Sequence, residues 1–534
     1  MSVGLALLAT MPPAHAAQDE ARSLNELRHT VVNLLQGLVD KGVLTREQAE
    51  KMVTDAQNKA QSDVAAQVAQ EKAEEGAVRV PYVPQIIKDE IRRQVTSDLS
   101  EQVTRNVVEA AEQEGWGVPA ALPDWARRMR WYGDIRVRGQ SDNFASDNIG
   151  NTYLDFQRVN DAGGIGKAGL AAFINTSEDR ERLRGRLRFG FETALGHGWT
   201  MGARLATGSL RDPISTNQTL GNYGFRNQIA VDLAYIDWAG TTSTGRHNFG
   251  ISAGRIKNPF FTATELVYDP DLTFEGVAGH LEFGLDRRDS SGRYAFLVAG
   301  AFPLQEVELS SQDKWLLGGQ LGLNWKYSGG SRTRLGAGVY HFRDIAGRRN
   351  GFESNLLDFT APPFLSRGNT LFDIRNDSDN TTNLYALAAD YTLANVSLAH
   401  EWRLGPEYRI TLAADGVRNI GYDTAKIVAR TGFSVPRRNK GYQAEIGFGS
   451  IAMNQTHAWR ATVGYRYVER DAVLDAFTDS DFHLGGTDAK GFMVGVDYAM
   501  SPMVTARLKY LSANEIDGPP LGIDLLQIDL TASF

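Results

Sequence analysis

The sequence predicts an all-β transmembrane barrel of about sixteen antiparallel strands, preceded by an N-terminal α-helical, coiled-coil-like extension. Three observations predict this fold. From Trp131 to the C-terminus, apolar and polar residues alternate with a period of two. The gaps between the alternating segments are short and long in turn, and the last segment is an amphipathic strand that ends on Phe534. Alternating segments of about ten residues, separated by turns, are typical of transmembrane barrels.

The segment from Leu183 to Leu195 shows the alternation most clearly. Its charged residues recur at every second position, and most of the residues between them are apolar. A helix would distribute these charges around its circumference, whereas a strand places them in one row. In a barrel channel the charged row faces water inside and the apolar row faces lipid. The same alternation recurs in 459–467, 492–498, 504–510 and 526–534.

The gaps between the segments determine the predicted number of strands. Short turns are expected near 196–198, 241–245, 328–331 and 501–502, and long loops near 141–181, 209–226, 257–273, 344–383, 420–440 and 470–488. Barrels of this class have short turns at one rim and long loops at the other. Long loops flank residues 384–419 on both sides, so an even number of strands must connect them. We therefore merge Leu384 to Leu404 into one strand, which brings the total to about sixteen.

The composition is compatible with a barrel and excludes several other functions. Hydrophobic residues make up 42% of the chain and the mean hydropathy is -0.31, because a barrel strand shows lipid only one of its faces. Cysteine is absent, which excludes a disulfide framework, thiol catalysis and a cysteine zinc site. The net charge of -8 argues against a nucleic-acid partner.

Residues 1–16 are expected to form a signal peptide. Val3 to Met11 is apolar, and Ala14-His15-Ala16 has the small-x-small form of a cleavage site. The apolar stretch is far shorter than the ~20 residues that a spanning helix needs. Because no later apolar run reaches that length, we expect the exported chain to be soluble in the periplasm, secreted, or a barrel.

Residues 17–115 are expected to form a periplasmic helical region, and residues 116–130 a linker to the barrel at 131–534. Apolar residues recur there at three- and four-residue steps, as in the seam of a coiled coil, at Leu24, Leu27, Val31, Leu34 and Leu38. Two interpretations stay open: the helices assemble with one another, or they form a solvated spacer.

Four segments resemble the proteobacterial family described as "putative porin". They are LRHTVVNLLQGLVDKGVLTREQA at 27–49, RVPYVP at 79–84, LPDWARRMRWYGDIRVRG at 122–139 and GRIKNPFFTATELVYDPDLTFEG at 254–276. The resemblance covers essentially the mature chain. It implies an outer-membrane channel for passive diffusion of small hydrophilic solutes or ions, without an enzymatic activity or a cofactor. A phosphate-selective, anion-type channel is the nearest alternative, because such porins also join N-terminal helices to a barrel.

The same resemblance implies several partners. A barrel in the outer membrane contacts its lipid and lipopolysaccharide, and the final strand ending in Phe534 resembles the signal that the barrel assembly machinery recognises. A homotrimer is suggested by analogy with sixteen-stranded porins. Another interpretation makes the protein chiefly a tether, in which the N-terminal helices bind a periplasmic or cell-wall partner and the barrel is the anchor.

The candidate pore-lining residues lie in one loop and on two strands. In general porins the third long loop folds inward, and here that loop is 257–273, with Phe260 and Phe261 available to hold it against the wall. Its acids are Glu265, Asp269 and Asp271, and the candidate opposing bases are Arg136, Arg138, Arg184, Arg186 and Arg188. Opposite charges across a constriction would create a transverse field that sorts solutes by charge and size. Alternatively, the arginines pair with carboxylates on neighbouring strands.

No catalytic or metal site is predicted. Residues 250–254 match the G-x-S-x-G motif, but they lie within an alternating strand and not at a strand-to-helix turn. Residues 164–169 match G-x-G-x-x-G, but they lie in a long loop. The histidines show no metal-binding spacing, and Asp269 and Asp271 lack an intact calcium loop around them. An enzymatic barrel would need a Ser/His/Asp set converging at one rim, which nothing in the sequence favours.

Overall fold

The structure, a computed structural model, describes residues 128–534 except 244, 286–291 and 309. It also describes seven helical positions between 47 and 59, which are Glu47, Glu50, Lys51, Thr54, Asp55, Asn58 and Lys59. The chain divides into two units, Met1–Gly117 and Val118–Phe534. The signal peptide, most of the helical region and most of the linker lie outside the described residues, so the predictions for them stay predictions.

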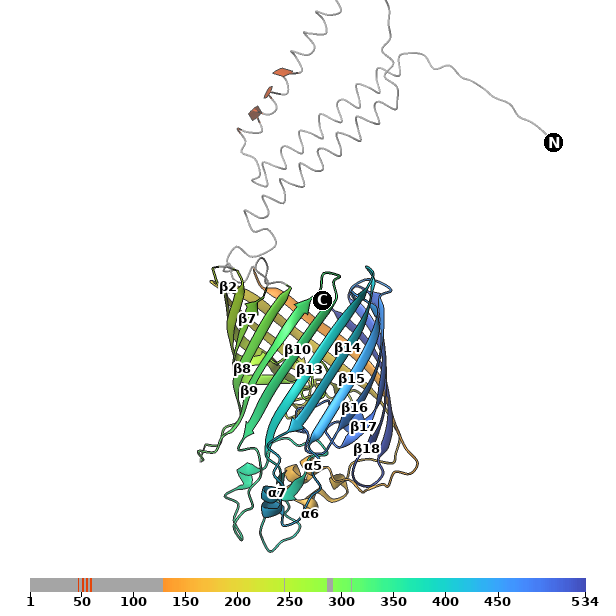
Figure 1. Ribbon diagram of the computed structural model, residues 1–534. Helices are drawn as coiled ribbons and strands as arrows, with labels where there is room; N and C mark the ends of the chain where they lie inside the picture. The colour runs from red at the N-terminus through yellow and green to blue at the C-terminus, as the bar shows by residue number, and fades with distance from the viewer. Residues whose placement is uncertain are drawn as a thin grey trace, which may run out of the picture. The chain divides into compact units, whose positions relative to one another are not determined.

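In the described part of unit Val118–Phe534, sixteen strands close into one antiparallel barrel (Figure 1). The barrel strands are β1 (Arg130–Phe144), β2 (Arg180–Gly196), β3 (Trp199–Thr207), β5 (Ile229–Thr241), β6 (His247–Lys257), β7 (Thr273–Gly284), β8 (Arg293–Gln305), β9 (Lys314–Lys326), β10 (Arg332–Arg343), β13 (Tyr391–Leu404), β14 (Tyr408–Asn419), β15 (Lys440–Ser450), β16 (Trp459–Val468), β17 (Ala489–Ser501), β18 (Val504–Glu515) and β19 (Gly522–Ser533). Each strand pairs with the next one along the chain, and β19 pairs with β1. The predicted number of strands is therefore confirmed.

The two rims of the barrel differ as predicted. The short-turn rim carries the connections 197–198, 242–246, 285–292, 327–331, 405–407, 451–458 and 502–503. The long-loop rim carries 145–179, 208–228, 258–272, 306–313, 344–390, 420–439, 469–488 and 516–521. A seventeenth, two-residue strand, β4 (Gln218–Thr219), lies within one of these loops and pairs with β2.

The prediction of one strand from Leu384 to Leu404 is wrong for its first residues. Residues 385–387 form a separate strand, β12 (Tyr385–Leu387), which pairs with β11 (Leu371–Asp373) outside the barrel wall. Ala386 and Leu387 are at most 1% exposed, so their apolar character belongs to the core of the long loops and not to a lipid-facing surface. Only β13 belongs to the barrel wall, so the number of barrel strands is still sixteen.

The alternation places charged side chains inside the barrel and apolar side chains outside. Ile135, Leu183 and Ile528 point outward and are 53%, 52% and 58% exposed. Arg138 and Asp529, which have the opposite parity, are each 4% exposed. The outer face is therefore the apolar surface that a bilayer requires.

The C-terminal residue completes the closure of the barrel. The Phe534 amide donates to the Gly133 carbonyl at 3.1 Å, and the Gly133 amide donates to the Phe534 carbonyl at 3.2 Å. The ring lies against Gly133, where a Cβ would meet the Phe534 Cζ at 2.8 Å. Exposed aromatic residues follow the short-turn rim on both sides of this closure, at Trp131, Trp199, Trp325, Tyr327, Trp402 and Tyr498.

The long loops carry short helices, which are α5 (Phe156–Ala162), α6 (Ile165–Ala168), η1 (Gly169–Ala172), η2 (Asp358–Thr360), α7 (Thr424–Thr431) and η3 (Phe482–Leu484). Of these, α5, α6 and α7 lie beyond the ends of the strands (Figure 1). The loops pack on one another, since the Asn160 side chain exchanges hydrogen bonds with the backbone of Tyr385 at 2.7 and 2.9 Å. In the described part of the chain, no helix has the length and apolar character needed to cross a bilayer.

Candidate functional site

The loop 258–272 folds inward and packs on the inner wall of β8, β9 and β10. The buried ring of Phe260 lies 4.9 Å from the ring of Tyr340 on β10 and 6.1 Å from that of Phe302 on β8, measured between centroids. Gly318 on β9 makes room for it, because a Cβ there would meet the Phe260 Cζ at 2.3 Å. The expectation that Phe260 holds the loop against the wall is confirmed.

Polar contacts fasten the same loop at two further points. The Phe261 amide donates to the Gln320 Oε1 at 2.7 Å, and the Gln320 Nε2 donates back to the Phe261 carbonyl at 2.7 Å. Farther along, the Thr264 amide and hydroxyl both donate to the Asp415 Oδ2, at 2.5 and 2.7 Å. The loop is therefore attached to β9 at one point and to β14 at another.

A second loop, 469–488, also folds inward and joins the first. The Thr478 hydroxyl donates to the Leu266 carbonyl at 2.9 Å, and the Asp269 amide donates to the Phe477 carbonyl at 2.8 Å. Sequence reasoning predicted this segment only as a long loop. Its run of apolar residues from Ala472 to Leu474, all at most 4% exposed, is the signal that it is not a solvated outer loop.

Arg466 on β16 secures this second loop from the wall. Its guanidinium donates to the Thr478 hydroxyl at 2.6 Å and to the Asp479 carboxylate at 3.2 Å, and its side chain is 0% exposed. The alternation in 459–467 predicts that Arg466 faces inward, but it does not mark Arg466 as a candidate pore residue. Its role depends on a loop position that parity alone does not determine.

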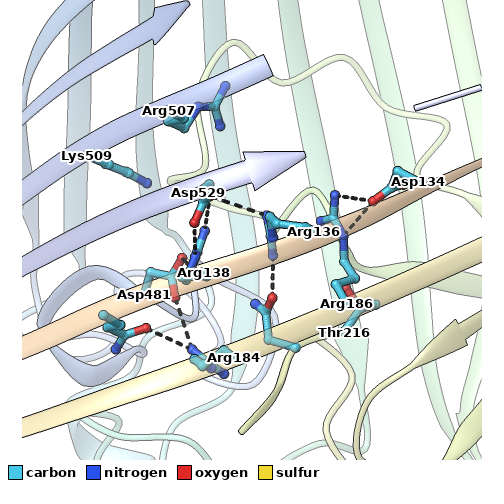
Figure 2. Close-up of polar contacts among 12 residues, drawn as sticks. Asp134, Arg136, Arg138, Arg184, Arg186, Thr216, Asp481, Arg507, Lys509 and Asp529 are labelled. Carbon is cyan, nitrogen blue, oxygen red and sulfur yellow. Dashed lines mark hydrogen bonds and ion pairs between the residues drawn. The ribbon is translucent and has the colours of Figure 1, made fainter. Parts of the chain in front are cut away.

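Arg138 on β1 lies between two carboxylates (Figure 2). Its Nε is 2.7 Å from the Asp529 Oδ1 on β19, and its Nη1 is 2.8 Å from the Asp481 Oδ2 in the loop 469–488. Arg184 on β2 approaches the same Asp481 at 3.8 Å. Burial acts to raise the pKa of Asp481, but the positive charges of Arg138, Lys509 and Arg184 hold it well below its usual range.

Arg186 and Arg188 on β2 share a second pair of carboxylates. Each comes within 2.7 Å of Asp134 on β1, and they approach Asp271 in the loop 258–272 at 3.7 and 3.2 Å. The Thr216 hydroxyl also donates to Asp271, at 2.7 Å. Arg186 and Arg188 therefore pair with a carboxylate of the neighbouring strand and also with an acid of an inward loop. Both of the arrangements that the sequence left open for the arginines are present here.

Arg136 has the weakest carboxylate pairing of the five candidate arginines. Its nearest carboxylate is that of Asp529, at 3.9 Å, and its Nη2 donates to the Asn217 side chain at 2.5 Å (Figure 2). Arg136 and Arg184 thus have only distant carboxylates, at 3.9 and 3.8 Å, whereas Arg138, Arg186 and Arg188 each have one within 2.7 Å.

The three predicted loop acids have three different environments. Asp271 faces the arginines of β2, whereas Asp269 is 5% exposed and lies between the two inward loops. Burial, together with the charges of Asp479 and Glu265, raises the pKa of Asp269 to about 9. Asp269 therefore does not face the arginines across the pore as the sequence suggested.

Glu265 faces a different part of the wall. Its side chain is 37% exposed, and its carboxylate lies 3.8 Å from the Nζ of Lys509 on β18. Lys509 lowers the pKa of Glu265, but partial desolvation and the charge of Asp479 more than offset this effect and raise it to about 7. Glu265 and Lys509 line a cavity of about 220 Å³ together with Glu445, Arg460, Asp497 and Arg507. These last residues have inward parity in the sequence, but only the folded chain shows that they meet the loop.

Within the described ranges 128–243, 245–285, 292–308 and 310–534, no group of three His, Asp or Glu side chains is arranged to hold a metal ion. The site therefore consists of two inward loops and the charged wall that they contact. Such a site can sort molecules by size and charge.

Comparison with known proteins identifies a family. The model of the "Putative porin" family matches residues 28–534. No curated protein sequence matches the chain. Among solved structures, OprB of Pseudomonas putida is 9% identical, with a TM-score of 0.41 over 77% of this chain and 95% of that one. The Acinetobacter baumannii channel DcaP is 12% identical, with a TM-score of 0.38 over 76% and 97%.

A third solved structure is OmpF of Salmonella typhi in complex with daunomycin. It is 12% identical, with a TM-score of 0.39 over 76% of this chain and 97% of that one. At these TM-scores the fold assignment rests on the strand pairing described above, and the family assignment rests on the match over residues 28–534. The chain belongs to the putative porin family of outer-membrane β-barrels, which are diffusion channels and not enzymes.

Proposed function

We propose that small hydrophilic solutes or ions cross the membrane through this barrel, and that the loops 258–272 and 469–488 form its constriction. The attachment of both loops to the inner wall supports this proposal most directly. Because the loops are held by buried rings and by ion pairs, they narrow the lumen in a defined position. A constriction formed by flexible loops would not discriminate reproducibly between solutes.

The charges at the constriction favour a channel with a preference for anions. Arg136, Arg138, Arg184, Arg186 and Arg188 line the β1 and β2 side, and Arg136 has no carboxylate closer than 3.9 Å. Glu265 and Lys509 contribute opposite charges on the β18 side. Rings of arginine and lysine are the usual means of anion selection in a pore. This charge distribution keeps the phosphate- or anion-selective channel as the finer alternative.

We further propose that the short-turn rim faces the periplasm, with residues 17–115 in that compartment. Both ends of the barrel sheet lie at this rim, as in barrels of this class. A homotrimer, and contacts with outer-membrane lipid, lipopolysaccharide and the assembly machinery, remain proposals that follow from the family.

Single-channel recording in planar bilayers tests the constriction. We expect the double variant Asp271→Asn/Asp481→Asn to shift ion selectivity toward anions, because it uncovers the arginines of β1 and β2. A matched control is Asp161→Asn/Asp517→Asn, which neutralises two loop acids that are paired elsewhere, with Arg211 and Arg438. If the first variant leaves conductance and selectivity unchanged, the constriction is not where we place it.

A further inference from the structure

A second cavity, of about 380 Å³, opens in the inner wall where the loop 258–272 begins. It is lined by residues of β2, β5, β6, β7, β8 and β10 and by Asn258 and Pro259 of the loop. It does not include the arginines of β1 and β2 described above. Its volume is within the range of cavities that bind small organic molecules.

Arg334 on β10 is the unusual residue of this cavity. Its Cζ lies 4.3 Å from the ring centroid of Phe261 and 5.1 Å from that of Phe296. Within the described part of the chain, its guanidinium makes no ion pair within 4.0 Å and has no hydrogen-bond acceptor, and its Nε is buried without a partner. By contrast, Arg138 and Arg186 on the other side of the lumen are each paired with two carboxylates.

The two aromatic rings hold the Arg334 guanidinium in place while leaving its terminal nitrogens without an acceptor. Stacking on aromatic rings is favourable for arginine, and a guanidinium held in this way loses little further freedom when it binds. Its planar donors match the two oxygens of a carboxylate. A ligand carboxylate would therefore supply the acceptors that the described protein residues do not.

Part of the cavity lining is apolar. Ile256, Ala278, Phe296 and Val298 are each at most 7% exposed and line the same cavity. Hydrocarbon that packs against these side chains would leave water, which is favourable in proportion to the apolar area buried. A ligand that satisfies both features carries an anionic head and an apolar body.

Three acids also line the cavity, Glu192, Asp237 and Glu282, and two of them are bound by donors of the protein. The Glu192 carboxylate is bound by the Arg130 guanidinium at 2.7 Å and by the Tyr235 hydroxyl at 2.9 Å. Glu282 accepts from the Asn248 amide at 3.1 Å. Lys257 also lines the cavity and, in the described residues, has no carboxylate within 4.0 Å.

We propose that this cavity is a binding site for small organic monocarboxylates with an apolar body, with the Arg334 guanidinium binding the carboxylate. The proposal rests on the proposed function, since the cavity lies in the wall of the channel and would bind solutes in transit. It names a solute class that a purely size-selective pore would not distinguish.

The test is to record the conductance of the full chain in planar bilayers while benzoate is added. Benzyl alcohol and benzylamine are the neutral and cationic probes with nearly the same body. We expect benzoate to reduce the conductance with a saturable dependence, and the other two probes to lack that saturable component. Arg334→Gln should weaken the benzoate effect by about tenfold or more, because a charge-assisted pair is lost.

Arg332→Gln is the matched control, because Arg332 lies on the same strand and the same face and binds Asn324 outside the cavity lining. This control changes the net charge equally and should keep the benzoate effect. Arg334→Lys should restore part of it, since lysine keeps the charge but not the planar pair of donors. Far-UV circular dichroism of each variant establishes that the barrel is folded.

Two failures are distinguishable. Absence of ion conductance in the folded wild-type protein would overturn the proposed function itself. Normal conductance would instead overturn only the site if benzoate shows no saturable effect, if Arg332→Gln weakens it as much as Arg334→Gln does, or if benzyl alcohol acts equally. The proposed solute class would also be wrong if a neutral sugar such as glucose reduced the conductance in a saturable, Arg334-dependent way and benzoate did not.

Discussion

The inner wall of the barrel has two contrasting arcs, and each holds an inward loop by a different kind of interaction. In the apolar arc, formed by β7 to β10, buried rings and glycines receive the loop 258–272. In the charged arc, formed by β1, β2, β18 and β19, ion pairs bind both inward loops. Figure 2 shows the ion pair of Arg138 with Asp481 of the loop 469–488. We propose from this contrast that the apolar arc determines where the proposed constriction lies and that the charged arc determines its electrostatics.

The largest effect is expected from removing the apolar anchor. Phe260→Ala deletes a ring that packs against Tyr340 and Phe302, and such a loss costs about 3–5 kcal/mol. We expect a lower thermal unfolding temperature and a larger, noisier single-channel conductance. Phe352→Ala removes a ring that is 73% exposed and should change neither measurement. Unchanged conductance in folded Phe260→Ala protein would show that this arc does not position the constriction.

A second test of the apolar arc changes the barrel wall instead of the loop, by filling the space that Gly318 leaves for the Phe260 ring. Gly318→Ala would place a Cβ 2.3 Å from the Phe260 Cζ, so the loop must shift, at a cost of about 1–3 kcal/mol. The neighbouring Gly319 has no atom within 4 Å of its Cβ position. We expect Gly318→Ala to alter conductance and Gly319→Ala to leave it unchanged. Equal behaviour of the two variants would contradict the packing that we describe.

A smaller and salt-dependent effect is expected in the charged arc. Asp481→Asn removes a carboxylate shared by Arg138 and Arg184, but Arg138 keeps Asp529, so we expect a loss of about 1–2 kcal/mol. Anion selectivity should increase at low salt and approach that of the wild type at high salt, because salt screens partly exposed charges. The reversal potential across a salt gradient measures this change. The effects of Phe260→Ala should persist at high salt. If instead the Phe260→Ala effects vanish at high salt and the Asp481→Asn effect persists, the roles that we assign to the two arcs are wrong.

The smallest effect is expected between the arcs, at Asp269. Its pKa is raised to about 9, mainly by burial, so the folded state favours the protonated carboxyl. Its contribution is therefore most favourable at pH below about 4 and is lost as the pH rises toward about 9. Asp269→Asn should stabilise the protein at pH 8, on the order of 1 kcal/mol, and much less at pH 4. Thermal unfolding at the two pH values measures this, and a gain independent of pH would rule out the titration of Asp269 as its cause.

Several features of the fold and site were predictable because they depend on local patterns. A period of two separates the lipid face from the lumen face at every strand, which gave the correct parity for Arg138, Arg184 and Leu183. The alternation of short turns and long loops gave the correct strand number. Phe260 was predictable as an anchor because a large apolar residue in a loop near a barrel wall has few other places to be buried.

The rest depends on contacts between segments far apart in the chain. The hairpin of β11 and β12 resembles a wall strand because a loop core and a lipid face both require apolar residues. Likewise, Asp269 and Asp271 are two residues apart, yet one lies buried between the loops and the other binds Arg188. Spacing along the chain does not determine which neighbour a loop residue meets.

The sequence by itself determined which residues face lipid, which face the lumen, and how many strands form the wall. Each of these follows from the two-residue period of a strand and the even strand number of such a barrel. Only the tertiary structure decided that the loop 469–488 also enters the lumen, that the arginines of β1 and β2 are paired, and that Arg334 is not. Those outcomes depend on the depth and direction of each loop, because an ion pair forms only where two segments bring opposite charges within a few ångströms.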